Sequence, residues 1–152
     1  TPQYGYFEVR LKTVALAGYM STLWMIGFEE SPEQSSGIDI CEIRGEHVSS
    51  KSSVIGYGVR ANKDPAIAED YHEDEITIDA SNFHIYAAEW TPSHIDFYID
   101  NQKTRTIQQS AAYPMQFMLG IYELPDSLTA EAKSVPFPKT MVVDYVRGYR
   151  RK

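Results

Sequence analysis

Two carboxylates, Asp39 and Glu42, lie three positions apart in the segment Gly-Ile-Asp-Ile-Cys-Glu that spans residues 37–42. The segment is apolar enough to predict a β-strand. Residues two apart on a strand face the same side, so position 37 shares a face with Asp39, whereas Glu42 would point away. A β-bulge inserts one residue and restores the alignment. We therefore predict a bulge near Cys41, with positions 37, 39 and 42 along one face.

Carboxylates arranged in this way suit the cleavage of a glycosidic bond. In the retaining mechanism one carboxylate attacks the anomeric carbon, and a second, about 5–5.5 Å away, protonates the leaving oxygen and later activates water. An aspartate between them keeps the proton affinity of the acid high and orients the nucleophile. Position 37 is a glycine, so one of the three groups is missing. The spacing alone equally fits an exposed Asp and Glu on an ordinary edge strand.

The composition limits the kinds of protein this chain can be. The chain has 152 residues, 43% hydrophobic and 12% aromatic, which predicts one domain over residues 1–152 with its own core. Its formal net charge of −7 argues against nucleic-acid binding and fits a neutral ligand. The sequence has no apolar run long enough to span a membrane. It starts at Thr1 without an apolar leader, so we expect a chain that is mature, trimmed or not secreted. Cys41 is the single cysteine, so no internal disulfide is expected.

The chain reads as β-strands almost throughout. Alternating or short apolar runs separated by turn residues predict strands over 4–13, 23–28, 38–43, 53–59, 75–79, 83–90, 94–100, 104–108, 115–122 and 140–149. The runs over 83–90, 94–100 and 104–108 have short connections and predict a meander. Residues 62–74 are polar and acidic and predict a long solvated loop rather than a metal site. Many short strands with frequent turns favour an all-β fold, a sandwich or a barrel.

With its surroundings, the carboxylate strand resembles glycoside hydrolase family 16. The resemblance rests on five segments in order: Tyr-Gly-Tyr-Phe-Glu-Val-Arg at 4–10, Leu-Trp-Met-Ile-Gly at 23–27, the strand at 37–42, the hairpin at 83–100 and Val-Val-Asp-Tyr-Val-Arg at 142–147. It implies an antiparallel β-sandwich, a concanavalin-like jelly roll with a concave sugar-binding groove. Members of this family are secreted hydrolases of β-glucans and galactans, so the resemblance implies an extracellular protein with a β-linked polysaccharide or oligosaccharide as its partner.

Carried over by position, the resemblance makes Glu42 the general acid/base and Asp39 the assisting aspartate, while Gly37 falls on the nucleophile. It thus implies retaining hydrolysis of β-glucan-type polysaccharides, with the turnover of this chain in question because no glycosyl ester can form at a glycine. Many members carry a histidine on the next strand, but residues 53–60 contain none. The family domain is also usually longer at its N-terminal side. We therefore expect exposed sheet edges and apolar surface, and the chain fits a truncated domain, a chain that pairs with another, or a reduced fold.

Three further residues are predicted to bind substrate. Trp24 could stack on a sugar ring or pack in the core, and Tyr122 and Glu123 end a strand that the resemblance places beside the groove. Trp90 is expected in the core. Asp144 resembles an aspartate that often helps to hold calcium in this family. The other ligands come partly from residues that precede this segment in the family, so we expect no cofactor, and a structural calcium ion at Asp144 stays open as an alternative.

A second function remains open from the sequence. A groove that has lost its nucleophile could bind β-glucan without cleaving it, as a lectin-like carbohydrate-binding β-sandwich. A structural or interaction sandwich without any sugar site fits least well, because the five segments keep the family's order. The sequence gives neither the sugar and its linkage nor the oligomeric state.

Overall fold

The computed structural model describes residues 1–28 and 30–150, and these residues form two antiparallel β-sheets. The strands are β1 (Gly5–Lys12), β2 (Tyr19–Gly27), β3 (Gly37–Arg44), β4 (Ser53–Arg60), β5 (Asp70–Ile76), β6 (His84–Trp90), β7 (Ile95–Ile99), β8 (Gln102–Ile107), β9 (Met115–Glu123) and β10 (Val142–Tyr149). The short helical turns are η1 (Gly45–His47), η2 (Pro125–Ser127) and α1 (Ala130–Ser134). No helix in the described part of the chain is long and apolar enough to cross a membrane.

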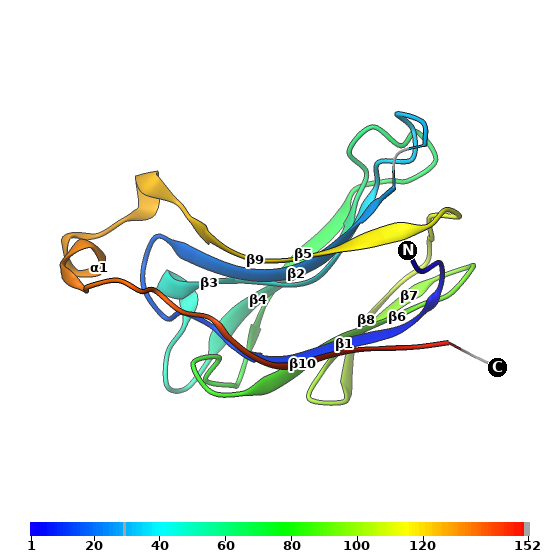
Figure 1. Cartoon of the computed structure of the whole chain (residues 1–152). Helices are drawn as coiled ribbons and strands as arrows, with labels where there is room; N and C mark the ends of the chain where they lie inside the picture. Colours follow the sequence, from blue (N-terminus) through cyan, green and yellow to red (C-terminus); the bar gives the residue numbers. More distant parts are fainter. Residues whose placement is uncertain (29, 151–152) are drawn as a thin grey trace.

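The two sheets stack as layers, as Figure 1 shows. One sheet has the order β5-β4-β3-β2-β9 and is called here the groove sheet. The other has the order β10-β1-β6-β7-β8 and is called the outer sheet. The predicted antiparallel sandwich is therefore confirmed. The predicted meander is confirmed as well, because β6 pairs with β7 and β7 pairs with β8.

The core lies between the two sheets and follows from the period-2 pattern of the strands. Val9 and Leu11 of β1 point inward from the outer sheet, and Leu23 and Met25 of β2 point inward from the groove sheet. Trp90 is 1% exposed and its indole nitrogen donates to Ser110 Oγ at 2.8 Å, so the expected core position of Trp90 is confirmed. Alternate residues of the same strands face outward and form the two outer surfaces of the sandwich.

The bulge predicted near Cys41 is present. The register of β2 with β3 shifts between the pairs Leu23–Cys41 and Trp24–Asp39, and the register of β3 with β4 shifts over the same stretch. Ile40 and Cys41 are both buried, because the extra residue lets two successive side chains enter the core. Burial raises the pKa of the Cys41 thiol to about 12, so this residue serves as an apolar filler.

The predicted loop over 62–74 is wrong from Asp70 onward. Asp70–Ile76 forms β5, which pairs with β4 over seven residues. The acidic side chains of this stretch suggested a solvated loop, yet charges are also usual on an edge strand, where one side of the ladder faces water. The pairing with β4 satisfies the backbone and overrides the local polarity.

Two edge strands, β9 and β10, carry exposed apolar side chains. Leu119 of β9 pairs with the buried Leu23, so it faces the core side of the sheet, but it is 44% exposed. Phe117 and Ile121 share that face and are 37% and 39% exposed, and Val146 of β10 is 45% exposed. The expectation of open sheet edges with apolar surface is therefore confirmed for the described residues.

Candidate active site

A cavity of about 500 Å³ lies on the outer face of the groove sheet. Residues from β2, β3, β4 and β9 and from the loop before β5 line it: Thr22, Trp24, Gly37, Asp39, Glu42, Arg60, Asn62, Glu69 and Tyr122. All three positions of the carboxylate strand that the sequence predicted on one face are therefore in a single cavity. A second cavity of about 530 Å³ shares Trp24 and Asn62 with the first, so the depression continues along the sheet. We call the two together the groove.

The bulge in β3 is the reason that Asp39 and Glu42 reach the same cavity. Asp39 pairs with Trp24 on one neighbouring strand, and Glu42 pairs with Thr22 on the same strand. Trp24 and Thr22 are two apart and face the same side, so their partners do too. Without the extra residue of β3, Glu42 would enter the core.

Gly37 leaves open space beside Asp39. A Cβ atom built there would lie 3.1 Å from the Met25 carbonyl oxygen, 3.7 Å from Arg60 Cβ and 3.9 Å from Asn62 Nδ2. Its φ angle is not in the left-handed region, so the backbone does not require glycine. A side chain at this position would extend into the cavity with only a slight adjustment of its neighbours.

Arg60 of β4 connects three carboxylates of the groove. Its Nε donates to Asp39 Oδ2 at 2.8 Å, its Nη1 donates to Glu69 Oε1 at 3.0 Å, and its Nη2 lies 3.8 Å from Glu42 Oε2. Arg60 pairs directly with Gly37 across the two strands. The guanidinium therefore lies next to the open space at position 37, although two carboxylates already accept its hydrogen bonds.

The surroundings raise the pKa values of both carboxyl groups on β3. Burial is the largest cause for Asp39, and the hydrogen bond and charge of Arg60 offset part of it. For Glu42, burial acts first and the negative charge of Asp39 second, while Arg60, Arg44 and Tyr71 act in the opposite direction. A carboxyl with a raised pKa holds its proton closer to neutral pH, as a general acid requires.

The structure brings two of the three predicted substrate residues to the groove. Trp24 lines both cavities, which favours its contact with ligand over core packing, and Tyr122 lines the first. Glu123 does not line either cavity. Its Oε2 accepts a hydrogen bond from the Tyr19 hydroxyl at 2.8 Å at the end of β9.

Asp144 lies on β10 of the outer sheet, away from the groove strands, and accepts a hydrogen bond from Arg10 Nη1 at 2.6 Å. This ion pair occupies the carboxylate that the resemblance associated with calcium. Among residues 1–28 and 30–150, no group of three or more His, Cys, Asp or Glu side chains is arranged to hold a metal ion. The structure does not test the expectation that the protein works without a metal.

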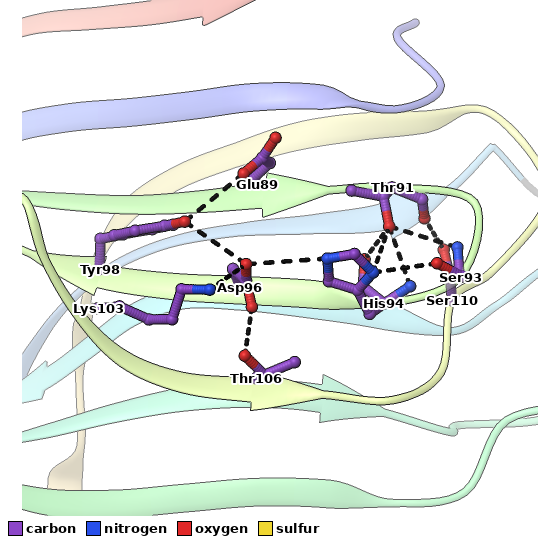
Figure 2. A network of polar contacts seen from close by, with 9 residues as sticks. All are labelled: Glu89, Thr91, Ser93, His94, Asp96, Tyr98, Lys103, Thr106 and Ser110. Atoms are coloured by element: carbon purple, nitrogen blue, oxygen red, sulfur yellow. Dashed lines mark hydrogen bonds and ion pairs between the residues drawn. The ribbon is translucent and has the colours of Figure 1, made fainter.

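A contrasting carboxylate lies on the far face of the sandwich (Figure 2). Asp96 of β7 accepts hydrogen bonds from Lys103 Nζ at 2.5 Å and from the Thr106 hydroxyl, and His94 Nε2 lies 3.8 Å away. Burial works to raise the pKa of Asp96, but the bonds from Lys103 and Thr106 outweigh it and lower the pKa. This carboxylate is thus fully compensated as an anion.

Sequence reasoning missed Arg60, Glu69 and Asn62. Arg60 ends a strand in which Gly56, Gly58 and Arg60 alternate, so extending the period-2 pattern by one residue would have placed Arg60 on the groove face. Glu69 and Asn62 fall in the stretch predicted as a solvated loop. Nothing in their local pattern distinguishes them from other polar loop residues.

Comparison with known proteins gives a consistent result. The sequence model of "Glycosyl hydrolases family 16" matches residues 1–146. The chain is 25% identical to glucan endo-1,3-beta-glucosidase A1 of Niallia circulans over 99% of its own length and 25% of that protein. It is 31% identical to a beta-glucanase of Fibrobacter succinogenes over 68% of its own length and 29% of that protein. The chain thus spans about a quarter to a third of these relatives.

Solved structures show the same fold. A GlcNAcα1-4Gal-releasing endo-β-galactosidase from Clostridium perfringens superposes with a TM-score of 0.79 at 27% identity, over 98% of this chain and 38% of that one. The laminarinase catalytic domain from Thermotoga maritima superposes with a TM-score of 0.78 at 21% identity, over 99% of this chain and 65% of that one. The second likeness, at this identity, supports the fold alone.

Proposed function

Because the chain belongs to glycosyl hydrolase family 16, we propose that its groove is a glycosidase site for β-glucan-type polysaccharides, with Glu42 as acid/base and with position 37 vacant. The observation that supports this proposal most is the bulge in β3, which brings Asp39 and Glu42 into one cavity with Trp24 and Tyr122. β3 is the central strand of the groove sheet, so the alternative of an ordinary edge strand does not apply.

Glu42 has the environment of a general acid. Its two nearest cations, Arg60 and Arg44, lie 3.8 Å and 3.9 Å away, beyond hydrogen-bond distance, so neither holds the group firmly as an anion. Its proton can pass to the leaving oxygen of a glycosidic bond, and the resulting carboxylate can then take a proton from an attacking water. Burial raises the pKa of Glu42 most, and the negative charge of Asp39 raises it further.

The groove also has the aromatic and polar lining that binds a sugar chain. Trp24 and Tyr122 offer aromatic faces for pyranose rings, and the surrounding polar groups can exchange hydrogen bonds with hydroxyls. Three carboxylates against one arginine make the site acidic, which suits a neutral polysaccharide better than an anionic one. We also propose that the protein acts outside the cell, because a polysaccharide substrate is too large to enter it.

Restoring a carboxylate at position 37 tests the proposal. In the retaining mechanism the nucleophile forms a bond to the anomeric carbon as the glycosidic C–O bond breaks. We expect Gly37→Glu to hydrolyse laminarin or mixed-linkage β-glucan at least about a thousandfold faster than the unmodified chain, since losing a catalytic nucleophile costs many orders of magnitude in other hydrolases. Reducing-end release is the measurement.

The double variant G37E/E42Q is the matched control, because it keeps the new carboxylate and removes only the acid/base. It should return to the rate of the unmodified chain. If G37E binds the glucans but cleaves none of them, or if G37E/E42Q is as fast as G37E, the assignment of the site is wrong.

The missing nucleophile favours a second candidate function. A groove that keeps Trp24 and Tyr122 but lacks a side chain at Gly37 can bind β-glucan without turnover. Calorimetry with laminari- and cello-oligosaccharides distinguishes this candidate from a site with no sugar ligand. Binding that is lost in Trp24→Ala would support it, and no heat with any oligosaccharide would remove it.

A further inference from the structure

The strand beside Glu42 has two glycines that face the groove. Gly56 of β4 pairs with Glu42, and Gly58 pairs with Asp39. Because neither contributes a side chain, β4 itself supplies no hydrogen-bond donor beside the Glu42 carboxyl until Arg60. The space above these glycines is open to a side chain from the next strand.

Tyr71 of β5 occupies that space. It pairs with Gly58, and its side chain reaches across Gly56 toward β3. A Cβ atom built at Gly56 would collide with the Tyr71 hydroxyl and would lie 3.2 Å from Glu42 Cβ. The hydroxyl and the Glu42 side chain therefore border the same point, and only glycine at position 56 allows this approach.

The Tyr71 hydroxyl is buried and makes no hydrogen bond of good geometry among the residues that the structure describes, although it lies close enough to Glu42 to lower the pKa of that carboxyl. A buried donor without a partner is unfavourable, and native proteins rarely leave one without a purpose. The neighbouring Glu42 carboxyl meets its two arginines only at 3.8 Å and 3.9 Å, so it has acceptor capacity to spare. A hydrogen bond between the Tyr71 hydroxyl and the Glu42 carboxylate would satisfy both groups.

Arg60 holds the Tyr71 ring in place. Its guanidinium carbon lies 3.4 Å from the ring centroid, while its nitrogens bond Asp39 and Glu69. The ring is therefore covered by a cation that two carboxylates orient, and it has little freedom to turn away from Glu42.

We propose that Tyr71 is a positioning residue for Glu42: its hydroxyl, passing over Gly56, donates a hydrogen bond to the Glu42 carboxylate and aims it into the groove. This inference rests on the proposed role of Glu42 as acid/base. Asp39 and Arg44 from β3 and Arg60 from β4 are the other charged groups that act on Glu42, and Thr22 from β2, its cross-strand partner, is neutral. The Tyr71 hydroxyl differs from these charged groups because it is a neutral donor that acts on the Glu42 carboxyl.

Titration of Glu42 by ¹³C NMR tests the proposal without requiring any turnover. In protein labelled with [¹³C]glutamate, the Glu42 carboxyl resonance is assigned by its loss in Glu42→Gln. A hydrogen bond to the carboxylate lowers its pKa, so we expect Tyr71→Phe to raise the Glu42 pKa by about half a unit or more. Gly56→Ala displaces the same hydroxyl and should move the pKa in the same direction.

Tyr57→Phe is the matched control, because Tyr57 lies on the adjacent strand and bonds Asp74 rather than Glu42. It should leave the Glu42 titration unchanged. An unchanged titration in folded Tyr71→Phe overturns the proposal, and so does an equal shift in Tyr57→Phe.

The two proposals fail in different assays. In the G37E background, Tyr71→Phe should move the alkaline limb of the pH–rate profile upward, because Glu42 would keep its proton to higher pH. If G37E cleaves no glucan, the proposed glycosidase function is wrong. If G37E cleaves glucan but Tyr71→Phe leaves the Glu42 titration unchanged, only the proposed role of Tyr71 is wrong.

Discussion

Two carboxylate clusters on opposite faces of the sandwich differ in how far their charges are compensated. On the outer sheet, Asp96 accepts bonds from Lys103 and Thr106 and has a lowered pKa. In the groove, Glu42 has long contacts with its two arginines, at 3.8 Å and 3.9 Å, and a raised pKa. Both clusters are partly buried and both contain cations, so burial alone does not explain the difference.

This difference in charge compensation indicates a different role for each cluster, one structural and one chemical. Hydrogen bonds to the charged form fix Asp96 as an anion and stabilise the meander that surrounds it. The groove keeps Glu42 near its cations without letting them bond it, and a neighbouring carboxylate makes ionisation harder. Incomplete compensation lowers stability but leaves a group able to exchange a proton, which is the usual sign of a functional site.

The largest expected effect comes from removing the cation of the groove. Arg60→Ala leaves the buried Asp39 without its hydrogen-bonded counter-ion, and we expect the free energy of unfolding to fall by about 2 kcal/mol. Urea denaturation at pH 7 measures it. Lys103→Ala is the corresponding change on the outer sheet and should cost clearly less than Arg60→Ala, because Lys103 is exposed to solvent and Asp96 keeps its bond from Thr106. Equal losses would show that the two clusters do not differ.

A smaller effect is expected for Asp96→Asn. A carboxyl whose pKa is lowered on folding stabilises the protein above its unfolded pKa, and this contribution is lost as the pH falls through its folded pKa. The variant should therefore be less stable than the unmodified protein at pH 7, by about 1–2 kcal/mol. The difference should shrink on acidification, as denaturation series at pH 7 and pH 3 would show. A difference that is constant with pH would contradict the assignment of this carboxylate.

The smallest effect has the opposite sign and concerns Glu42→Gln. A carboxyl whose pKa is raised on folding lowers stability as the pH rises from its unfolded to its folded pKa. The variant should therefore be more stable than the unmodified protein at pH 7, by about 0.5–1 kcal/mol, with the difference vanishing below the ordinary glutamate pKa of about 4.3. Urea denaturation of the variant and the unmodified protein at pH 7 and at pH 3 measures this difference. A variant that is less stable than the unmodified protein at pH 7 would contradict the account.

The groove could be predicted from sequence where strand periodicity decides the outcome. Asp39 and Glu42 are brought together by a bulge that follows from their spacing, and Trp24 then lies opposite Asp39. Arg60 and Tyr71 could not be placed in the same way. Their roles depend on how β4 and β5 pair, and the acidic run at 70–74 hides β5 from any pattern based on local polarity.

Glu123 shows the complementary limit. It follows Tyr122 directly on β9, and adjacent strand residues face opposite sides, so both could not line one groove. On the face of the sheet opposite to the groove, the Tyr19 hydroxyl of β2 donates a hydrogen bond to the Glu123 carboxylate. Applied strictly to the sequence, the two-residue period of a strand would have predicted that Tyr122 and Glu123 face opposite sides of the sheet.

Anion rescue tests the central claim, a working acid/base beside a vacant nucleophile position, most directly. With an aryl β-laminaribioside and azide, the azide nitrogen should bond the anomeric carbon from the open side at Gly37 while the C–O bond breaks and Glu42 protonates the leaving oxygen. The account predicts an α-glycosyl azide from the unmodified chain, formed more slowly by Glu42→Gln and absent without the anion. The absence of any glycosyl azide from folded protein that binds the substrate would contradict it.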